Sequence, residues 1–166
     1  MSVKTITRIA LMSAILYVSK FALDAIPNVE LVSFLLIIYT IVFGKETLIV
    51  ATVFNLFQFI QWGVGDWLFM YLYIWPLLVL VTLLLKKVVK EEFLVWAIVS
   101  GMFGLAFGFL CTPVYLIEVG PATALAKWVS GLVFDIPHGI FNFLIMLVLG
   151  KPMYKLLKKL KIAYEK

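Results

Sequence analysis

The sequence predicts an all-α integral membrane protein, a compact bundle of six transmembrane helices that forms a single domain over residues 1–166. Of its residues, 64% are apolar and only 14% are charged, whereas a soluble domain is close to half apolar and a quarter charged. A soluble fold of this size leaves roughly a third of its chain surface exposed, so the excess apolar surface is expected to face lipid. The apolar residues show no strict alternation, which excludes a membrane barrel.

Polar residues and glycines divide the chain into six apolar runs, each a candidate helix. In order, these runs cover residues 6–23, 31–43, 47–62, 67–85, 93–117 and a last stretch from 122 or 128 to 149. One helical crossing of the hydrocarbon core takes about 20 residues. Six crossings with short loops therefore fit into 166 residues, and little length remains for a soluble catalytic or nucleotide-binding domain.

Each run ends at residues that are costly in lipid or that break helices. The boundary segments are 24–30, 44–46, 63–66, 86–92, 118–121 and 151–152. They contain the acidic, basic, glycine and proline residues that interrupt the apolar pattern. The second run, 31–43, is shorter than a full span, and the fifth, 93–117, is long and rich in glycine.

The positive residues predict how the bundle is oriented. With six spans, twelve of the fourteen Lys and Arg fall on one side: Lys4, Arg8, Lys45, Lys86, Lys87, Lys90, Lys151, Lys155, Lys158, Lys159, Lys161 and Lys166. The positive-inside rule makes that side cytoplasmic, so both termini are expected to be cytoplasmic. Attraction to anionic headgroups also accounts for a net charge of +5, and we expect no nucleic-acid partner.

The opposite, external side is polar and aromatic. The segment 58–67 holds Gln58, Gln61, Trp62, Asp66 and Trp67, separated by two glycines. The aromatic residues can be interpreted as an interfacial belt. The whole set can also form a loop that closes over a small molecule bound at that membrane face.

The last run carries three polar residues on one helix face. Asp135, His138 and Asn142 are spaced i, i+3 and i+7, so their side chains point the same way. A carboxylate in hydrocarbon is costly and is expected to face the bundle interior or a wet cavity. The three can bind a ligand, relay a proton or hold helices together. A metal site is not expected, because one histidine without a cysteine cluster falls short of a zinc ligand set.

The first run carries small residues at helical spacing. Ala10 and Ala14 are four residues apart, with Ser13 beside them. Small residues at this spacing let another helix approach closely. That helix can belong to the same bundle or to a partner protein.

Several function classes lack their sequence features. Asp135 and His138 are the only close pair of candidate catalytic groups, and nothing near them suggests a triad. No Walker-type loop is present, so the chain cannot hydrolyse ATP alone. Neither the internal repeats of secondary transporters nor the pore motifs of channels are visible. The remaining class is a small membrane binding protein that takes energy from partners. A standalone membrane carrier or a membrane enzyme is the alternative.

Four segments carry a resemblance to a known family. They are 7–14 (TRIALMSA), 27–31 (PNVEL), 134–142 (FDIPHGIFN) and 150–152 (GKP). The first is similar to the AxxxA pattern of that family's first helix. With its six spans, its length and both termini cytoplasmic, the chain resembles the substrate-binding S-components of energy-coupling factor (ECF) transporters, the vitamin-uptake systems of bacteria.

The resemblance implies a non-catalytic subunit of an ATP-driven importer, located in the bacterial plasma membrane. Such a subunit binds a vitamin or a vitamin precursor from outside, and it associates with a membrane coupling subunit and two cytoplasmic ATPases. ATP and magnesium would bind to those ATPases, so no cofactor is expected on this chain. The external Trp and Tyr residues suit a large or planar ligand, which makes cobalamin or a corrinoid precursor the first expectation. Riboflavin, pyridoxine-type vitamins and pantothenate are the alternatives.

The resemblance also implies two sets of functional residues. Ala10, Ser13 and Ala14 would contact the coupling subunit. The substrate cavity would be lined from Asn28, Glu30, Gln58, Gln61, Trp62, Asp66, Trp67, Tyr71, Trp75, Tyr115, Lys127, Asp135, His138 and Asn142.

Overall fold

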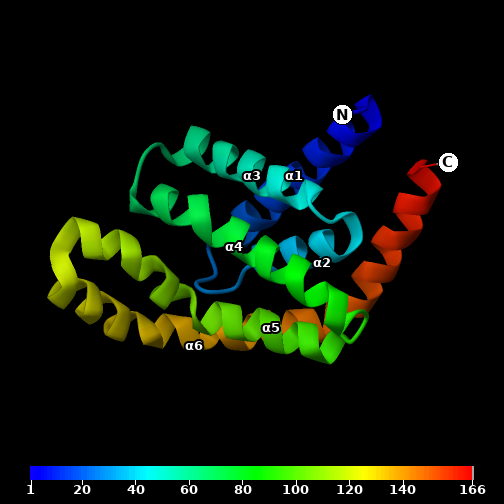
Figure 1. Ribbon diagram of the computed structural model, residues 1–166. Coiled ribbons are helices and arrows are strands. Elements are labelled where there is room, and N and C mark those ends of the chain that lie inside the picture. The colour runs from blue at the N-terminus through cyan, green and yellow to red at the C-terminus, as the bar shows by residue number, and fades with distance from the viewer. Residues whose placement is uncertain (166) are drawn as a thin grey trace.

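The computed structural model describes residues 1–165, and within them the chain is helical with no strand (Figure 1). The elements are α1 (Val3–Leu23), α2 (Val32–Phe43), α3 (Glu46–Trp62), α4 (Asp66–Val89), α5 (Phe93–Leu105) and α6 (Phe107–Glu165). The all-α prediction is therefore confirmed. Three stretches are long and apolar enough to cross a membrane: α1, α4 and the region Phe93–Tyr164.

Helix α2 forms the centre of the bundle. All residues from 32 to 40 are buried, on every side of the helix. A helix that is apolar nearly all round belongs in the interior, and α2, with 12 residues, lies there. The surrounding helices expose large apolar side chains instead, among them Leu84 at 69% and Val148 at 66%. Such an outer surface suits contact with lipid.

The structure corrects the predicted end of the fifth run. Residues 93–117 are not one helix, because α5 ends at Leu105 and α6 begins at Phe107. The first amides of a helix have no partner within it, and the Gly108 amide donates instead to Asp135 Oδ1 at 3.1 Å. The break therefore supplies a backbone donor to a buried carboxylate, which an apolar run in the sequence does not reveal.

The structure also corrects the last run, which continues beyond 149 to Glu165. Its C-terminal part is held by contacts with the connection between α4 and α5: the Tyr154 hydroxyl donates to Glu91 Oε1 at 2.7 Å, and the Lys158 ammonium donates to the same atom at 3.1 Å. Within α6, Gly120 has a φ of 77°, which a glycine adopts without strain. The chain reverses there, in the yellow-green hairpin of Figure 1, and the following part of α6 runs back beside α5.

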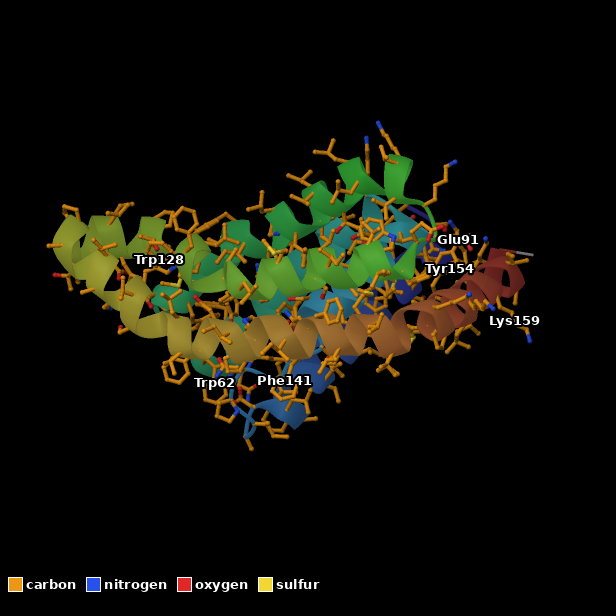
Figure 2. The ribbon with its side chains drawn as sticks, turned by 90° about the horizontal axis from the view of Figure 1, so that it is seen from below. Trp62, Glu91, Trp128, Phe141, Tyr154 and Lys159 are labelled. Carbon is orange, nitrogen blue, oxygen red and sulfur yellow. The ribbon has the colours of Figure 1, made fainter. Side chains whose placement is uncertain are left out.

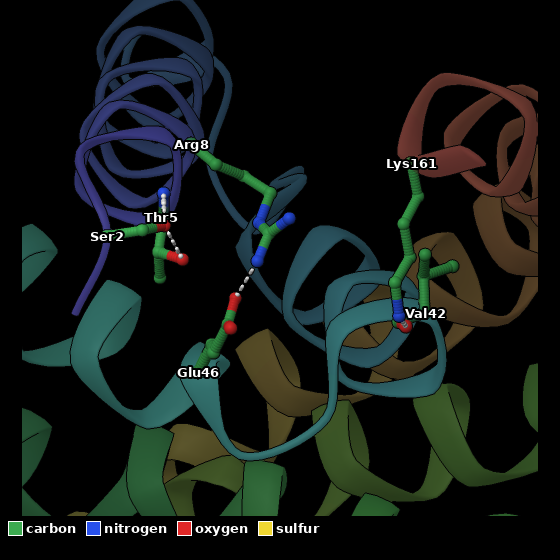
Figure 3. A network of polar contacts seen from close by, with 6 residues as sticks. All are labelled: Ser2, Thr5, Arg8, Val42, Glu46 and Lys161. Carbon is green, nitrogen blue, oxygen red and sulfur yellow. Dashed lines mark hydrogen bonds and ion pairs between the residues drawn. The ribbon is translucent and has the colours of Figure 1, made fainter. Parts of the chain in front are cut away.

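Cationic side chains meet at one end of the fold, here termed the cationic end. Arg8 of α1 bonds Glu46 of α3 at 2.7 Å, and Lys161 of α6 donates to the Val42 carbonyl at 3.1 Å (Figure 3). Figure 2 shows Glu91, Tyr154 and Lys159 at this end and Trp128 far from them. These contacts join the start of α1 to the start of α3 and the end of α6 to the end of α2, and Lys86 of α4 donates to the Thr40 carbonyl of α2 at 3.1 Å. Lys166 lies outside the described residues.

Candidate functional site

A cavity of about 370 Å³ lies toward the other end of the bundle from the cationic end. It is lined by the loop between α1 and α2 with the adjoining ends of both helices, and by α4 and α6. Six of the predicted substrate residues line it: Asn28, Glu30, Tyr71, Trp75, Asp135 and His138. The cavity therefore gathers residues from the first loop, the fourth helix and the last helix of the chain.

The loop that lines the cavity has a defined shape. Its backbone is tied by bonds from the Asp24 amide to the Phe21 carbonyl and from the Ile26 amide to the Leu23 carbonyl. Asn28 has a positive φ of 62°, a conformation that asparagine tolerates better than most residues. This reversal leads the chain directly into Glu30 and the start of α2.

Glu30 and His138 form a buried carboxylate–imidazole pair across the cavity wall. Glu30 Oε1 lies 3.2 Å from His138 Nε2, and Glu30 Oε2 accepts the Ser33 amide at 2.9 Å. The second bond places a carboxylate at the start of α2, where the helix dipole favours negative charge. Burial alone would raise the pKa of Glu30, but the bond and charge of His138 and the bonds from Ser33 outweigh burial and hold this pKa below its usual value.

Asp135 also lines the cavity, and one of its oxygens has no partner. Oδ1 accepts the Gly108 amide, whereas Oδ2 is buried without a hydrogen bond to any described residue. An unsatisfied buried acceptor costs free energy. Binding sites contain such groups where a ligand completes the hydrogen bonding.

Aromatic rings form another part of the cavity wall. Tyr71 and Trp75 lie one helical turn apart on α4 with ring centroids 5.1 Å from each other, and Trp75 lies 5.7 Å from Phe107. Phe107 in turn contacts the imidazole of His138 at 5.1 Å. The Asn55 amide anchors this region by donating to the Tyr71 carbonyl at 3.0 Å. A flat ligand in the cavity would find ring faces beside its polar partners.

No family model, curated protein or solved structure matches this chain. Its function is therefore inferred from the residues and their geometry.

A second cavity, also about 370 Å³, lies between α1, α2 and the end of α6 at the cationic end. Most of its lining is apolar, with Leu11, Ile15 and Leu160 among the residues and Arg8 and Lys161 as the charged exceptions. Both charged groups already have partners in the protein. The first cavity, with its acidic and aromatic lining, is the better candidate for recognising a polar small molecule.

The other predicted substrate residues lie outside the cavity lining. Gln58 and Asn142 are buried inside the bundle, and Asn142 has no hydrogen-bond partner for either amide atom among the described residues. The rest are exposed or half-buried: Gln61, Trp62, Asp66, Trp67, Tyr115 and Lys127. Trp67 reaches the aromatic wall through Tyr71, at 5.7 Å.

Tyr115 and Lys127 contact each other in the hairpin of α6. The ammonium of Lys127 lies 4.0 Å from the centroid of the Tyr115 ring, a distance typical of a cation–π interaction. The structure therefore places the two residues together but does not bring them to the cavity wall.

Several lining residues were missed by sequence reasoning. Lys20 and Asp24 line the cavity and bond each other at 2.5 Å, and Phe107, Gly131 and Phe134 are also part of its wall. The i, i+4 spacing of Lys20 and Asp24 predicts their pairing. Phe107 carried no signal, because it lies inside an uninterrupted apolar run.

The small residues of α1 divide into two groups. Ala10 and Ala14 are exposed on the outer face of the helix. Ser13 is fully buried, and its hydroxyl lies 2.9 Å from the Ile9 carbonyl and 3.4 Å from the Val50 carbonyl of α3. Only Ala10 and Ala14 therefore present a surface that a partner helix can approach.

Proposed function

We propose that this chain is the membrane-embedded substrate-binding subunit, or S-component, of an ECF-type vitamin transporter. The main support is the cavity opposite the cationic end. It combines a buried carboxylate–imidazole pair, a carboxylate with an unsatisfied oxygen and an aromatic wall, which are features of a specific small-molecule site.

In this proposal the chain crosses the bacterial plasma membrane six times. The hairpin at Gly120 supports this count, because the chain reverses there. Residues 93–119 then form the fifth crossing, and the part of α6 after Gly120 forms the sixth. The cationic end faces the cytoplasm by the positive-inside rule. The cavity then opens toward the outside, from where the vitamin or its precursor enters.

The energy for transport comes from partner proteins. This chain contains no phosphate-binding loop, so two cytoplasmic ATPases bind and hydrolyse ATP with magnesium. A membrane coupling subunit links them to this chain by packing against the exposed face of α1. The open surface at Ala10 and Ala14 supports this assignment.

The first experiment is a thermal-unfolding screen of the detergent-purified protein with B vitamins, their precursors and corrinoids. A ligand that binds only the folded state stabilises it by about 2.7 kcal/mol at a hundred times its dissociation constant. We expect at least one compound to raise the melting temperature. A protein that responds to none of them and does not associate with an ECF module would contradict the proposal.

Substitution of Asp135 by alanine is expected to weaken binding of that compound by tenfold or more, about 1.4 kcal/mol. The folded state should survive, because the change removes an acceptor that is already half unsatisfied. Isothermal titration calorimetry measures the affinity, and the melting temperature reports folding. The control is Asp66→Ala, which removes an exposed carboxylate outside the cavity and should leave the affinity unchanged. Unchanged affinity in Asp135→Ala with a lower melting temperature would assign Asp135 a purely structural role.

Tryptophan at both Ala10 and Ala14 is expected to abolish copurification with an ECF module. Two indole rings prevent the close helix approach that small residues allow. Ligand affinity should stay unchanged, since neither residue lines the cavity. Leu84→Trp, on the exposed face of α4, is the matched control and should copurify normally. Retained association of the double variant would rule out this face as the partner surface.

A further inference from the structure

We propose that the ligand portion held in the cavity is a compact planar heteroaromatic ring bearing a cationic or N–H-donating nitrogen, rather than a carboxylate or a corrinoid. This inference rests on the proposed function of the cavity as the substrate site. It adds the charge, shape and size of the molecule that the site selects.

The charges around the cavity favour a positive or donor-rich ligand. Its lining contains three carboxylates, those of Asp24, Glu30 and Asp135, against the Lys20 ammonium and the His138 imidazole. Carboxylates outnumber the basic groups even when the imidazole is protonated. An anionic ligand placed here would meet like charges, which costs free energy in a partly buried site.

The hydrogen bonds within the protein also favour a ligand that donates hydrogen bonds. The Lys20 ammonium bonds Asp24, and the His138 ring nitrogen that faces the acidic residues bonds Glu30. Both basic side chains are thus already engaged with carboxylates of the protein. Asp135 is the lining carboxylate that has a buried oxygen without a partner. An N–H group of the ligand can donate a hydrogen bond to that oxygen. An ionised carboxylate on the ligand cannot, because it only accepts hydrogen bonds.

The rings give the ligand its shape. Tyr71, Trp75 and Phe107 lie within 5.1–5.7 Å of their neighbours in one continuous wall that ends at His138. Aromatic faces attract flat rings and also cations through their quadrupole. A ring that carries positive charge uses both interactions at once, whereas a flexible aliphatic acid uses neither.

The volume of the cavity limits the size of the ligand portion that it can hold. A cavity of about 370 Å³ lies near the lower end of the roughly 300–1,000 Å³ that encloses drug-sized ligands. A corrinoid is a large macrocycle with substituents all round, so only part of it could lie inside a cavity of this volume. A single heteroaromatic ring with short substituents fits, and we therefore favour it over the corrinoid expected from the abundance of aromatic residues.

The test compares two molecules that share one ring. Pyridoxamine carries an aminomethyl group where 4-pyridoxate carries a carboxylate, and thiamine, pantothenate and cobalamin complete the set. Binding to the purified full chain is measured by isothermal titration calorimetry. We expect pyridoxamine to bind at least tenfold more tightly than 4-pyridoxate, and the cationic rings to bind more tightly than pantothenate or cobalamin.

Two variants locate the origin of the preference. Asp135→Asn keeps an oxygen for the Gly108 amide but loses the negative charge, so the ratio of the two affinities should fall several-fold. Asp24→Asn, in the exposed loop, should lower the ratio as well and is the variant less able to disturb folding. Asp66→Asn makes the same chemical change outside the cavity and should leave the ratio unchanged.

The outcomes separate the ligand class from the proposed function. Equal or tighter binding of 4-pyridoxate, pantothenate or cobalamin would overturn the ligand class while leaving a substrate-binding protein. A preference for pyridoxamine that all three variants retain would also overturn it, because the acidic lining would then not cause the selectivity. Failure of every compound to bind would contradict both the ligand class and the proposed function.

Discussion

Replacement of His138 by alanine is expected to lower the free energy of unfolding by about 3–5 kcal/mol and to abolish ligand binding. The imidazole is the partner of Glu30 Oε1 at 3.2 Å, and both side chains are buried. Removal of the imidazole leaves the buried Glu30 carboxylate without its hydrogen-bond partner at Oε1, and an uncompensated buried charge is the source of that cost. The stability can be measured by denaturation in mixed detergent micelles, and the affinity by calorimetry with the compound found in the thermal screen.

A second variant distinguishes two causes of the lost stability: the uncompensated charge of Glu30 and the lost packing of the His138 imidazole. In Glu30→Gln the amide oxygen can still accept the Ser33 bond, and no negative charge remains. Adding Glu30→Gln to His138→Ala should therefore restore part of the lost stability. If the double variant is as unstable as His138→Ala, the cost comes from the contact of the imidazole with Phe107 and not from the charge of Glu30.

This pair also shows what the sequence can and cannot predict. The i, i+3, i+7 spacing correctly placed Asp135, His138 and Asn142 on one buried face, because helical geometry follows from local sequence. Glu30 lies 108 positions before His138, and only the folded bundle brings the two together. Hydropathy indicates that a carboxylate in an apolar segment needs a hydrogen-bond or charge partner, but it does not identify the residue that supplies it.

The position of the predicted substrate residues that lie outside the cavity lining has a related explanation. The topology predicted from the sequence places a residue at a depth in the membrane. It does not show whether the side chain faces the interior of the bundle or its outer surface. Gln61, Trp62 and Asp66 lie at the connection between α3 and α4 and are exposed, whereas Tyr71 and Trp75 on α4 point inward to the cavity. The break at Ala106 was also invisible, since Phe103 and Phe107 flank it with equally apolar residues.

Valine at Gly104 is expected to destabilise the protein by about 3 kcal/mol, at the upper end of the cost of overpacking. A Cβ atom at Gly104 would lie 2.9 Å from the Cα and the amide nitrogen of Gly139 and 2.9 Å from the His138 carbonyl carbon. These are backbone atoms of α6, so no side-chain rotation relieves the clash. Helix α5 must move away from α6.

The displacement should also weaken ligand binding, because it acts on the backbone of His138 and so on the pair with Glu30. Gly131→Ala is a control for stability alone within α6, because residue 131 lines the cavity. A Cβ there meets nothing within 4 Å, and alanine favours a helix over glycine by up to about 1 kcal/mol. We therefore expect Gly131→Ala to unfold no more easily than the unmodified protein. Normal stability and affinity in Gly104→Val would mean that α5 and α6 can separate without disturbing the cavity, and the close helix contact would then have no part in positioning His138.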